Sequence, residues 1–203
     1  ALAQERQNHF IAGRMTNTLG WLRQEFGDFA GSLELDRESA DIGHRIKNGN
    51  VEISALINIG FDRLVLEGPR PALELFEQTF ERARKAFGAH RWRWSIHLSF
   101  GIATALMALD RDGDALAAIE RGLAEAETTG SLKYVGWFHA RRGEIALRAG
   151  DRPAAMDSLR RALAIAREIG YPTLTWQVGD LLARAHADLG AADDARTAAR
   201  LAE

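Results

Sequence analysis

Cysteine is absent from this sequence of 203 residues. Disulfides, cysteine-ligated zinc and a thiol nucleophile are therefore excluded within it. A chain without cysteine suits a reducing compartment, so a cytoplasmic location is expected. Long apolar runs are also missing, since no stretch approaches the roughly 18 residues that a membrane-spanning helix needs. We therefore expect no membrane partner.

An excess of charge of one sign is missing as well. The formal net charge is only −2 at pH 7, which gives no field that would attract nucleic acid. Direct nucleic-acid binding is therefore not expected. Hydrophobic residues make up 46% and charged residues 27% of the chain, a balance typical of a folded protein. Because the chain begins without methionine, we expect a fragment of a larger protein.

The sequence does contain a repeat. Small residues recur at intervals of roughly 40 positions, in two parallel series separated by a turn signal such as Gly27 or Gly150. The first series is Gly20, Gly60, Ala103, Gly143 and Ala183. The second series is Ser32, Ala72, Ala115, Ala155 and Ala195.

Helical hairpins explain this pattern. Two helices that cross closely need a small residue at the contact, so we expect Gly or Ala of a first helix to meet Ala of a second helix. Asp151 is expected to cap one of the second helices. The expected pairs are 4–26 with 28–47, 51–67 with 70–87, 91–109 with 112–129, 131–149 with 151–169, and 172–189 with 191–203. The predicted fold class is all-α: a single domain, residues 1–203, that forms a right-handed α-solenoid of five antiparallel helix pairs.

The small-residue register resembles the tetratricopeptide repeat (TPR). That family has a Leu-Gly pair in the first helix, a turn glycine seven residues later and alanines at fixed distances beyond it. The fourth unit matches best, with Gly143, Gly150, Ala155, Leu159 and Ala162. The resemblance covers nearly the whole chain, and it implies a TPR-like superhelix whose first helices line a concave side that binds partners.

The chain departs from the family pattern in two respects. The bulky aromatic residues expected in the first helices are replaced, for example by Thr16 and His139. The period is about 40 residues instead of about 34, so each helix is roughly one turn longer. Long-period repeats of this kind are similar to those of bacterial multidomain signalling proteins with an ATPase module of the maltose-activator type. This resemblance implies a sensor or scaffold segment in a signalling or transcription-regulatory protein.

Motifs for catalysis are missing. The sequence holds no phosphate-binding P-loop, no HExxH and no GxSxG. No two histidines have the i, i+4 spacing of a helical metal site, and the acidic residues around Asp112 lack the order of a calcium loop. We therefore expect no enzyme activity, no catalytic residue, no metal and no cofactor.

Tryptophan and arginine alternate from Arg91 to Trp94, a pattern that also occurs where proteins bind nucleic acid or phosphate. On a helix, Trp92 and Trp94 point about 200° apart. We therefore favour packing over ligand binding, with one ring buried and the other at the surface.

Side chains of the first helices form the candidate partner-binding surface. Counted from the small-residue register, they are Arg14, Asn17, Trp21 and Gln24 in the first pair, His97 in the third, Trp137, Arg141, Glu144 and Arg148 in the fourth, and Gln177, Asp180 and Arg184 in the fifth. Polar groups mixed with tryptophan suit recognition of a partner, although the carboxylates also offer ion pairs to the arginines within the fold. The second pair instead presents the apolar Ile57, Phe61 and Leu64, which suit either a partner helix or closure of the solenoid on itself.

The leading hypothesis is a non-catalytic scaffold that binds a protein or peptide segment on its concave face. That segment can also belong to another domain of the same chain. The alternative is a regulatory domain that senses a small molecule in the same groove. An apolar face at an unfinished end of a solenoid further predicts a homodimer through the terminal helices.

Overall fold

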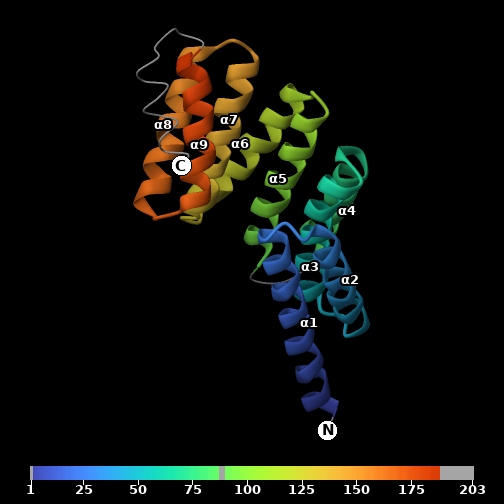
Figure 1. Cartoon of the computed structure of the whole chain (residues 1–203). Coiled ribbons are helices and arrows are strands. Elements are labelled where there is room, and N and C mark those ends of the chain that lie inside the picture. The colour runs from blue at the N-terminus through green and yellow to red at the C-terminus, as the bar shows by residue number, and fades with distance from the viewer. Residues whose placement is uncertain (1, 87–89, 188–203) are drawn as a thin grey trace. The chain divides into compact units, whose positions relative to one another are not determined.

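Helices form every regular element in the part of the chain that the structure describes (Figure 1). The computed structural model describes residues 2–86 and 90–187. The helices are α1 (Leu2–Glu25), α2 (Phe29–Arg45), α3 (Gly49–Leu66), α4 (Pro69–Lys85), α5 (Arg91–Ala108), α6 (Asp112–Thr128), α7 (Leu132–Arg148), α8 (Arg152–Glu168) and α9 (Pro172–Ala187). They confirm the first nine predicted helices, with each boundary within about two residues of the prediction. The predicted tenth helix, 191–203, lies outside the described residues.

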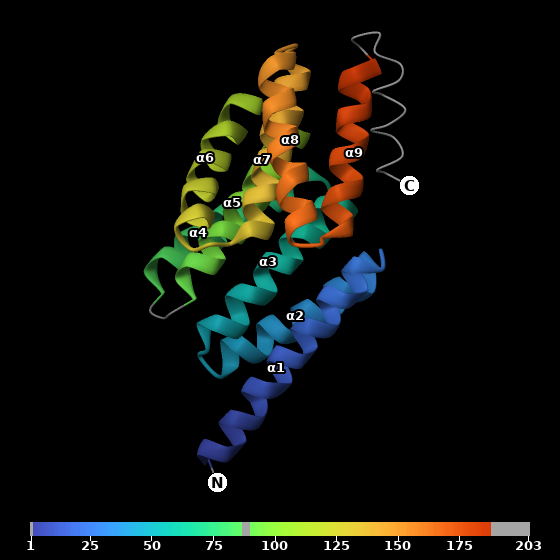
Figure 2. The same ribbon diagram turned by 90° about the vertical axis from the view of Figure 1, so that its left-hand side faces the viewer.

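The helices group into two compact units. Unit 1, residues 1–111, holds α1 to α5, and unit 2, residues 112–203, holds α6 to α9. Within unit 1, α2 packs on α1 and α3, and α4 packs on α3 and α5 (Figure 2). Within unit 2, α7 packs on α6, α8 and α9. Within each unit, helices that follow one another in the sequence therefore pack side by side, as a hairpin repeat requires, and the single domain of residues 1–203 stays a prediction.

A three-residue turn with one recurring backbone conformation joins most of the helices. Its middle residue has a positive φ, between 53° and 81°. Glycine adopts this left-handed conformation without steric strain, which explains the glycine signals in the sequence. The middle residues are Gly27, Lys47, Asp110, Gly130, Gly150 and Gly170.

Aspartate occupies the last position of two of these turns and caps the next helix there. The Asp28 carboxylate accepts a hydrogen bond from the backbone N–H of Gly31 at 2.9 Å. The Asp151 carboxylate accepts one from the N–H of Ala154 at 3.1 Å, which confirms the predicted cap. Each cap satisfies a backbone donor that the helix itself leaves unpaired.

Glycines of the first series lie where the two helices of a pair touch, but they make room for larger side chains than predicted. A Cβ added to Gly143 would lie 2.7 Å from Cγ of Leu159 and 3.3 Å from the carbonyl oxygen of Ala155. At Gly20 it would lie 2.6 Å from a carboxylate oxygen of Asp36. The predicted helix contact is present. The second-helix atoms nearest to each glycine belong to Leu159 or Asp36, which lie one turn after the small residue of the second series.

Two tryptophans of α5 lie in opposite environments, as predicted. Trp94 is only 4% exposed, whereas Trp92 is 40% exposed. The apolar strip of the second pair contributes to packing inside unit 1, since Ile57 is buried and the Phe61 ring lies edge-on to Phe76 at 5.0 Å. No described helix is both long and apolar enough to cross a membrane.

Candidate functional site

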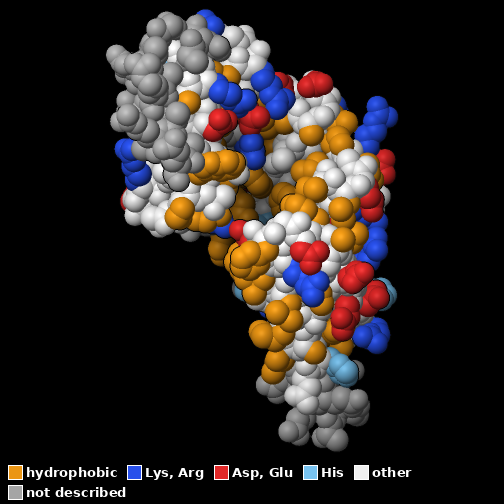
Figure 3. Space-filling model, viewed as in Figure 1, with side chains coloured by type: hydrophobic (Ala, Val, Ile, Leu, Met, Phe, Trp, Pro, Cys, Tyr) orange, Lys and Arg blue, Asp and Glu red, His pale blue; other side chains and the backbone are white. Residues whose placement is uncertain are grey.

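Aromatic and charged side chains gather on the two first helices of unit 2, α7 and α9. Intervals of three or four residues place the α7 members on one side of that helix. Figure 3 shows basic and acidic side chains beside hydrophobic ones in this region. We name this surface the α7–α9 face. Its members are Lys133, Trp137, Arg141, Glu144 and Arg148 of α7, Tyr171 just before α9, and Trp176, Gln177, Asp180 and Arg184 of α9.

Two aromatic rings and two cations form the centre of the α7–α9 face. The rings of Trp137 and Tyr171 lie 6.3 Å apart, nearly perpendicular to each other at 79°. The guanidinium carbon of Arg141 lies 5.8 Å from the centre of the Trp137 ring. The ammonium group of Lys133 lies 4.7 Å from the centre of the Tyr171 ring. Cation–π attraction therefore orients both basic side chains on aromatic surfaces.

A row of ion pairs extends from this centre. Nη1 of Arg141 donates to Glu144 at 2.7 Å, and Nη2 of Arg148 donates to the other oxygen of the same carboxylate at 3.1 Å. Nη1 of Arg148 also donates to Asp112 of α6 at 3.3 Å. Burial raises the pKa of Glu144, but the two arginines outweigh burial and hold this pKa below its usual value. Glu144 is therefore ionised at neutral pH and fixes both guanidinium groups.

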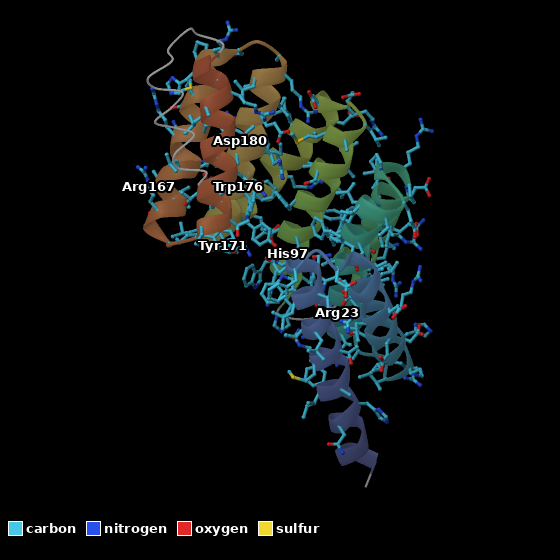
Figure 4. All side chains as sticks on the ribbon, viewed as in Figure 1. Arg23, His97, Arg167, Tyr171, Trp176 and Asp180 are labelled. Carbon is cyan, nitrogen blue, oxygen red and sulfur yellow. The ribbon has the colours of Figure 1, made fainter. Side chains whose placement is uncertain are left out.

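The α9 members of the face are more exposed. Figure 4 shows Trp176 and Asp180 following one another along one side of α9. The Trp176 ring is 52% exposed. Asp180 pairs with Arg184 at 3.5 Å, and both side chains are largely exposed, so this pair adds little to stability. Gln177 is half-buried beside them.

In unit 1, two of the predicted partner-binding residues take part in an internal polar network. Nδ2 of Asn17 donates to Asp36 at 2.7 Å, and Nε2 of Gln24 donates to Asp62 at 2.8 Å. Both carboxylates are fully buried. The hydroxyl of Ser32 lies between them, 3.3 Å from an Asp36 oxygen and 3.0 Å from an Asp62 oxygen. This network ties α1, α2 and α3 together.

The two buried aspartates have unusual proton affinities. Burial raises the pKa of Asp36 to about 7, although hydrogen bonds from Asn17 and Asn58 oppose the rise. Burial raises the pKa of Asp62 as well, against hydrogen bonds from Gln24 and Ser32. No lysine or arginine is among the groups that shift these pKa values. Only hydrogen bonds therefore offset the cost of burying the two carboxyl groups.

The remaining predicted residues of unit 1 are spread over two helices. Arg14 is half-buried on α1, and Trp21 of the same helix is 42% exposed. His97 is half-buried on α5. The α7 and α9 members, by contrast, lie together in one unit, so the α7–α9 face is the best candidate site.

Sequence reasoning missed several residues that shape these sites. Lys133 and Tyr171 were absent from the predicted set, although Lys133 lies one turn before Trp137 and shares its side of the helix. Asp36 and Asp62 carried no signal, because a buried aspartate looks the same in sequence as an exposed one. Hydrogen bonds from the side-chain amides and from the Ser32 hydroxyl make their burial tolerable.

Other features of the described residues bear on ligand binding. Within these residues, no group of three or more histidine or carboxylate side chains is placed to hold a metal ion. A surface hollow of about 450 Å³ lies along α2, and four polar side chains line it. They are Glu38, Asp41, His44 and Arg45. This hollow belongs to a second helix, so the predicted first-helix groove does not include it.

No family model matches this chain, and no curated protein matches it. Solved structures do match its fold. TTC0263, a thermophilic TPR protein from Thermus thermophilus, matches with a TM-score of 0.68 and 22% identity, over 94% of this chain and 90% of that one. BtubC from P. vanneervenii matches with a TM-score of 0.70 and 15% identity, over 100% of this chain and 89% of that one.

A putative kinesin light chain with nearly identical TPR-like repeats, from Podosopora anserina, is also similar. Its TM-score is 0.61 at 17% identity, over 93% of this chain and 92% of that one. These similarities confirm the predicted fold class, an all-α solenoid of the TPR type. The narrower resemblance to long-period repeats of the maltose-activator kind stays a prediction.

Proposed function

We propose that this chain is a non-catalytic protein-interaction scaffold that binds a segment of a partner protein on the α7–α9 face. The main observation in support is that Arg141 is held in place, because its guanidinium group contacts both the Trp137 ring and the Glu144 carboxylate. A side chain that is already ordered loses less conformational entropy when a partner binds. Arginine and aromatic residues are also the types that dominate binding energy at protein interfaces.

The chemistry of the face favours a partner segment that carries both an apolar and an acidic side chain. Trp176 and Tyr171 offer aromatic surface, and Lys133 offers positive charge next to the Tyr171 ring. The Asp180 carboxylate, which is largely exposed, can accept a hydrogen bond from the backbone N–H of an extended peptide. The TPR-type fold supports this function, because helical solenoids use the surface lined by one helix of each pair to bind partners.

The cellular setting follows from the sequence resemblance. We place the scaffold in a bacterial signalling or transcription-regulatory protein of the cytoplasm. Its partner segment then comes from another protein or from another domain of the same polypeptide.

Selection from a random peptide library tests this function. A library of displayed 12-residue peptides is selected on the immobilised chain, and fluorescence anisotropy then measures the Kd of each enriched peptide. The Kd is compared between the native chain, Trp176→Ala and Arg141→Gln. We expect each substitution to weaken binding about tenfold or more, which corresponds to about 1.4 kcal/mol.

Arg161→Ala is the matched control. Arg161 also forms an ion pair within its own helix, with Asp157 at 3.1 Å, but it lies on α8 outside the α7–α9 face. The control is expected to bind every selected peptide with native affinity. Peptides that lose no affinity in Trp176→Ala and Arg141→Gln would show that this face is not the binding site. A library that yields no binding peptide would contradict peptide recognition and favour the small-molecule alternative.

A further inference from the structure

Helix α1 directs its large apolar side chains away from the rest of unit 1. The side that faces α2 and α3 carries small and polar residues: Gly13 and Gly20 are buried there, and Asn17 and Gln24 donate to buried aspartates. A Cβ on Gly13 would lie 2.6 Å from a methyl carbon of Val51 in α3, so the approach on this side is close. The usual arrangement of an amphipathic helix, with large apolar residues inside, is therefore reversed.

The opposite side of α1 bears five large apolar side chains, which we name the α1 stripe. They are Ile11, Met15, Leu19, Leu22 and Phe26, and their exposed fractions are 49%, 56%, 54%, 40% and 87%. Their spacing keeps them within an arc of about 80° around the helix axis. Figure 3 shows hydrophobic side chains following one another along α1. From Met15 to Phe26 the intervals are four, three and four residues, the spacing of a coiled-coil seam.

The repeat register shows what this side of a first helix normally does. The equivalent positions are Val51, Ala55 and Ile59 in α3 and Leu174, Val178 and Leu182 in α9, and each is at most 5% exposed. In α3 these side chains pack against the preceding helix pair. The α1 stripe has the same register, but its side chains are between 40% and 87% exposed. An exposed apolar stripe of this length indicates an interaction surface.

We propose that a second copy of this chain covers the α1 stripe by packing its own α1 stripe against it. The stripe contains no charged residue, so two identical faces meet without opposed like charges. A two-fold axis makes one surface complementary to itself, which is the commonest way in which proteins form dimers. The mutual contact is a seam of two helices in which Leu19 lies near the axis.

The exposed area is sufficient for this contact. The five side chains expose on the order of 500 Å² of apolar surface per copy, which exceeds the single scattered residues of an ordinary surface. Two copies together would bury about 1,000 Å², which is near the lower limit for a specific interface and fits a reversible dimer.

Sedimentation equilibrium of the 203-residue chain tests the assembly. We expect a concentration-dependent mass that approaches twice 22.4 kDa between about 1 and 200 µM, as for a reversible dimer. The double variant Leu19→Glu, Leu22→Glu places charges in the seam and is expected to raise the dimer dissociation constant at least tenfold. Both side chains are exposed and glutamate is a good helix former, so helix content by circular dichroism is expected to stay unchanged.

Val65→Glu is the matched control, because Val65 is 57% exposed on α3 and lies outside the α1 stripe. It is expected to dimerise as the native chain does. A native chain that stays monomeric at 200 µM overturns the proposed dimer. A dimer that survives in the Leu19→Glu, Leu22→Glu variant also overturns it, because association then uses another surface.

Cross-linking gives an independent measurement, since the native chain has no cysteine. A Leu19→Cys variant is treated with a short bis-maleimide, and a Val65→Cys variant serves as the control. Covalent dimer is expected from Leu19→Cys at low micromolar concentration, with little from Val65→Cys. Equal yields from both variants would count against a seam centred on Leu19.

Discussion

The backbone of Gly60 in α3 lies directly against the ring of Phe76 in α4, so closely that no Cβ fits between them. Gly101 of α5 approaches the same ring from another helix, and a Cβ there would lie 2.6 Å from the ring carbon Cε1. The Phe61 ring completes the surroundings with an edge-on contact. Phe76 is fully buried, so three helices of unit 1 meet on one side chain.

Replacing Gly60 by alanine is therefore expected to destabilise the protein. Alanine raises helix propensity by about 1 kcal/mol, but overpacking at the Phe76 ring costs about 1–3 kcal/mol, and we expect the loss to dominate. Urea denaturation followed by circular dichroism measures the change. Gly113→Ala is the control, because no atom lies within 4 Å of a Cβ at Gly113 in α6. A Gly60→Ala protein as stable as Gly113→Ala would contradict the contact with Phe76.

Leucine in place of Ala155 is expected to lower the free energy of unfolding by about 1–3 kcal/mol. Ala155 is fully buried, and its carbonyl oxygen would lie 3.3 Å from a Cβ on Gly143. The larger side chain of leucine cannot be held there without moving α7 from α8. Ala154→Leu, at the exposed neighbouring position, is the matched control and is expected to leave the denaturation midpoint unchanged. An unchanged midpoint in Ala155→Leu would show that this crossing is looser than the structure indicates.

Protonation of Asp36 is expected to make the stability of unit 1 depend on pH. The folded protein holds this proton up to about pH 7, whereas an aspartate in the unfolded chain releases it near 3.8. Between these pH values the folded state binds more protons, so the free energy of unfolding falls as the pH rises. The difference corresponds to at most about 4 kcal/mol. Urea midpoints between pH 4.5 and 8 measure the loss.

Asp36→Asn is expected to remove the part of this pH dependence that Asp36 contributes, because asparagine has no proton to release, while the part from Asp62, whose pKa burial also raises, remains. Burial lowers the pKa of His139, so His139 makes the free energy of unfolding rise with pH. Comparing the variant with the native chain cancels this contribution. Asp157→Asn, at a largely exposed aspartate of α8, is expected to keep the native dependence. Parallel pH curves for the native chain and Asp36→Asn would show that Asp36 is ionised in the folded state.

Removing the Trp137 side chain is expected to reduce stability and binding together. Trp137 is only 8% exposed and its ring contacts both Tyr171 and Arg141. Truncation of a buried tryptophan to alanine costs about 3–5 kcal/mol, so we expect a clear drop in the urea midpoint of Trp137→Ala. Trp176→Ala, at 52% exposure, is expected to keep the native midpoint. Equal midpoints in the two variants would place the Trp137 ring at the surface.

The sequence predicted the helices well, because their signals are local. Turn glycines such as Gly27 and Gly150 mark positions that need a positive φ, and Asp151 marks a helix start through its own side chain. Small residues such as Gly143 marked the helix contacts, but they did not reveal that Leu159 fills the space. The size of that partner depends on the angle at which the helices meet, which a pattern of small residues does not encode.

Within the candidate site, the sequence indicates side-chain contacts only where one helix supplies both residues. Arg141, Glu144 and Arg148 share a side of α7, and their ion pairs follow from that spacing. Asn17 and Gln24 have the same kind of spacing on α1, yet they donate to aspartates of α2 and α3. A helical pattern tells which residues share a side, and only the packing of neighbouring helices decides whether that side meets solvent.

The short turns that join the helices also bear on how this chain folds. In the six turns whose middle residue has a positive φ, a helix meets its neighbour after only three connecting residues. Among the described helices, contacts join only elements that are adjacent or next but one in the sequence. Such a low contact order keeps the entropy of loop closure small, so each hairpin can form early and independently, and folding is expected to be fast for a chain of this length.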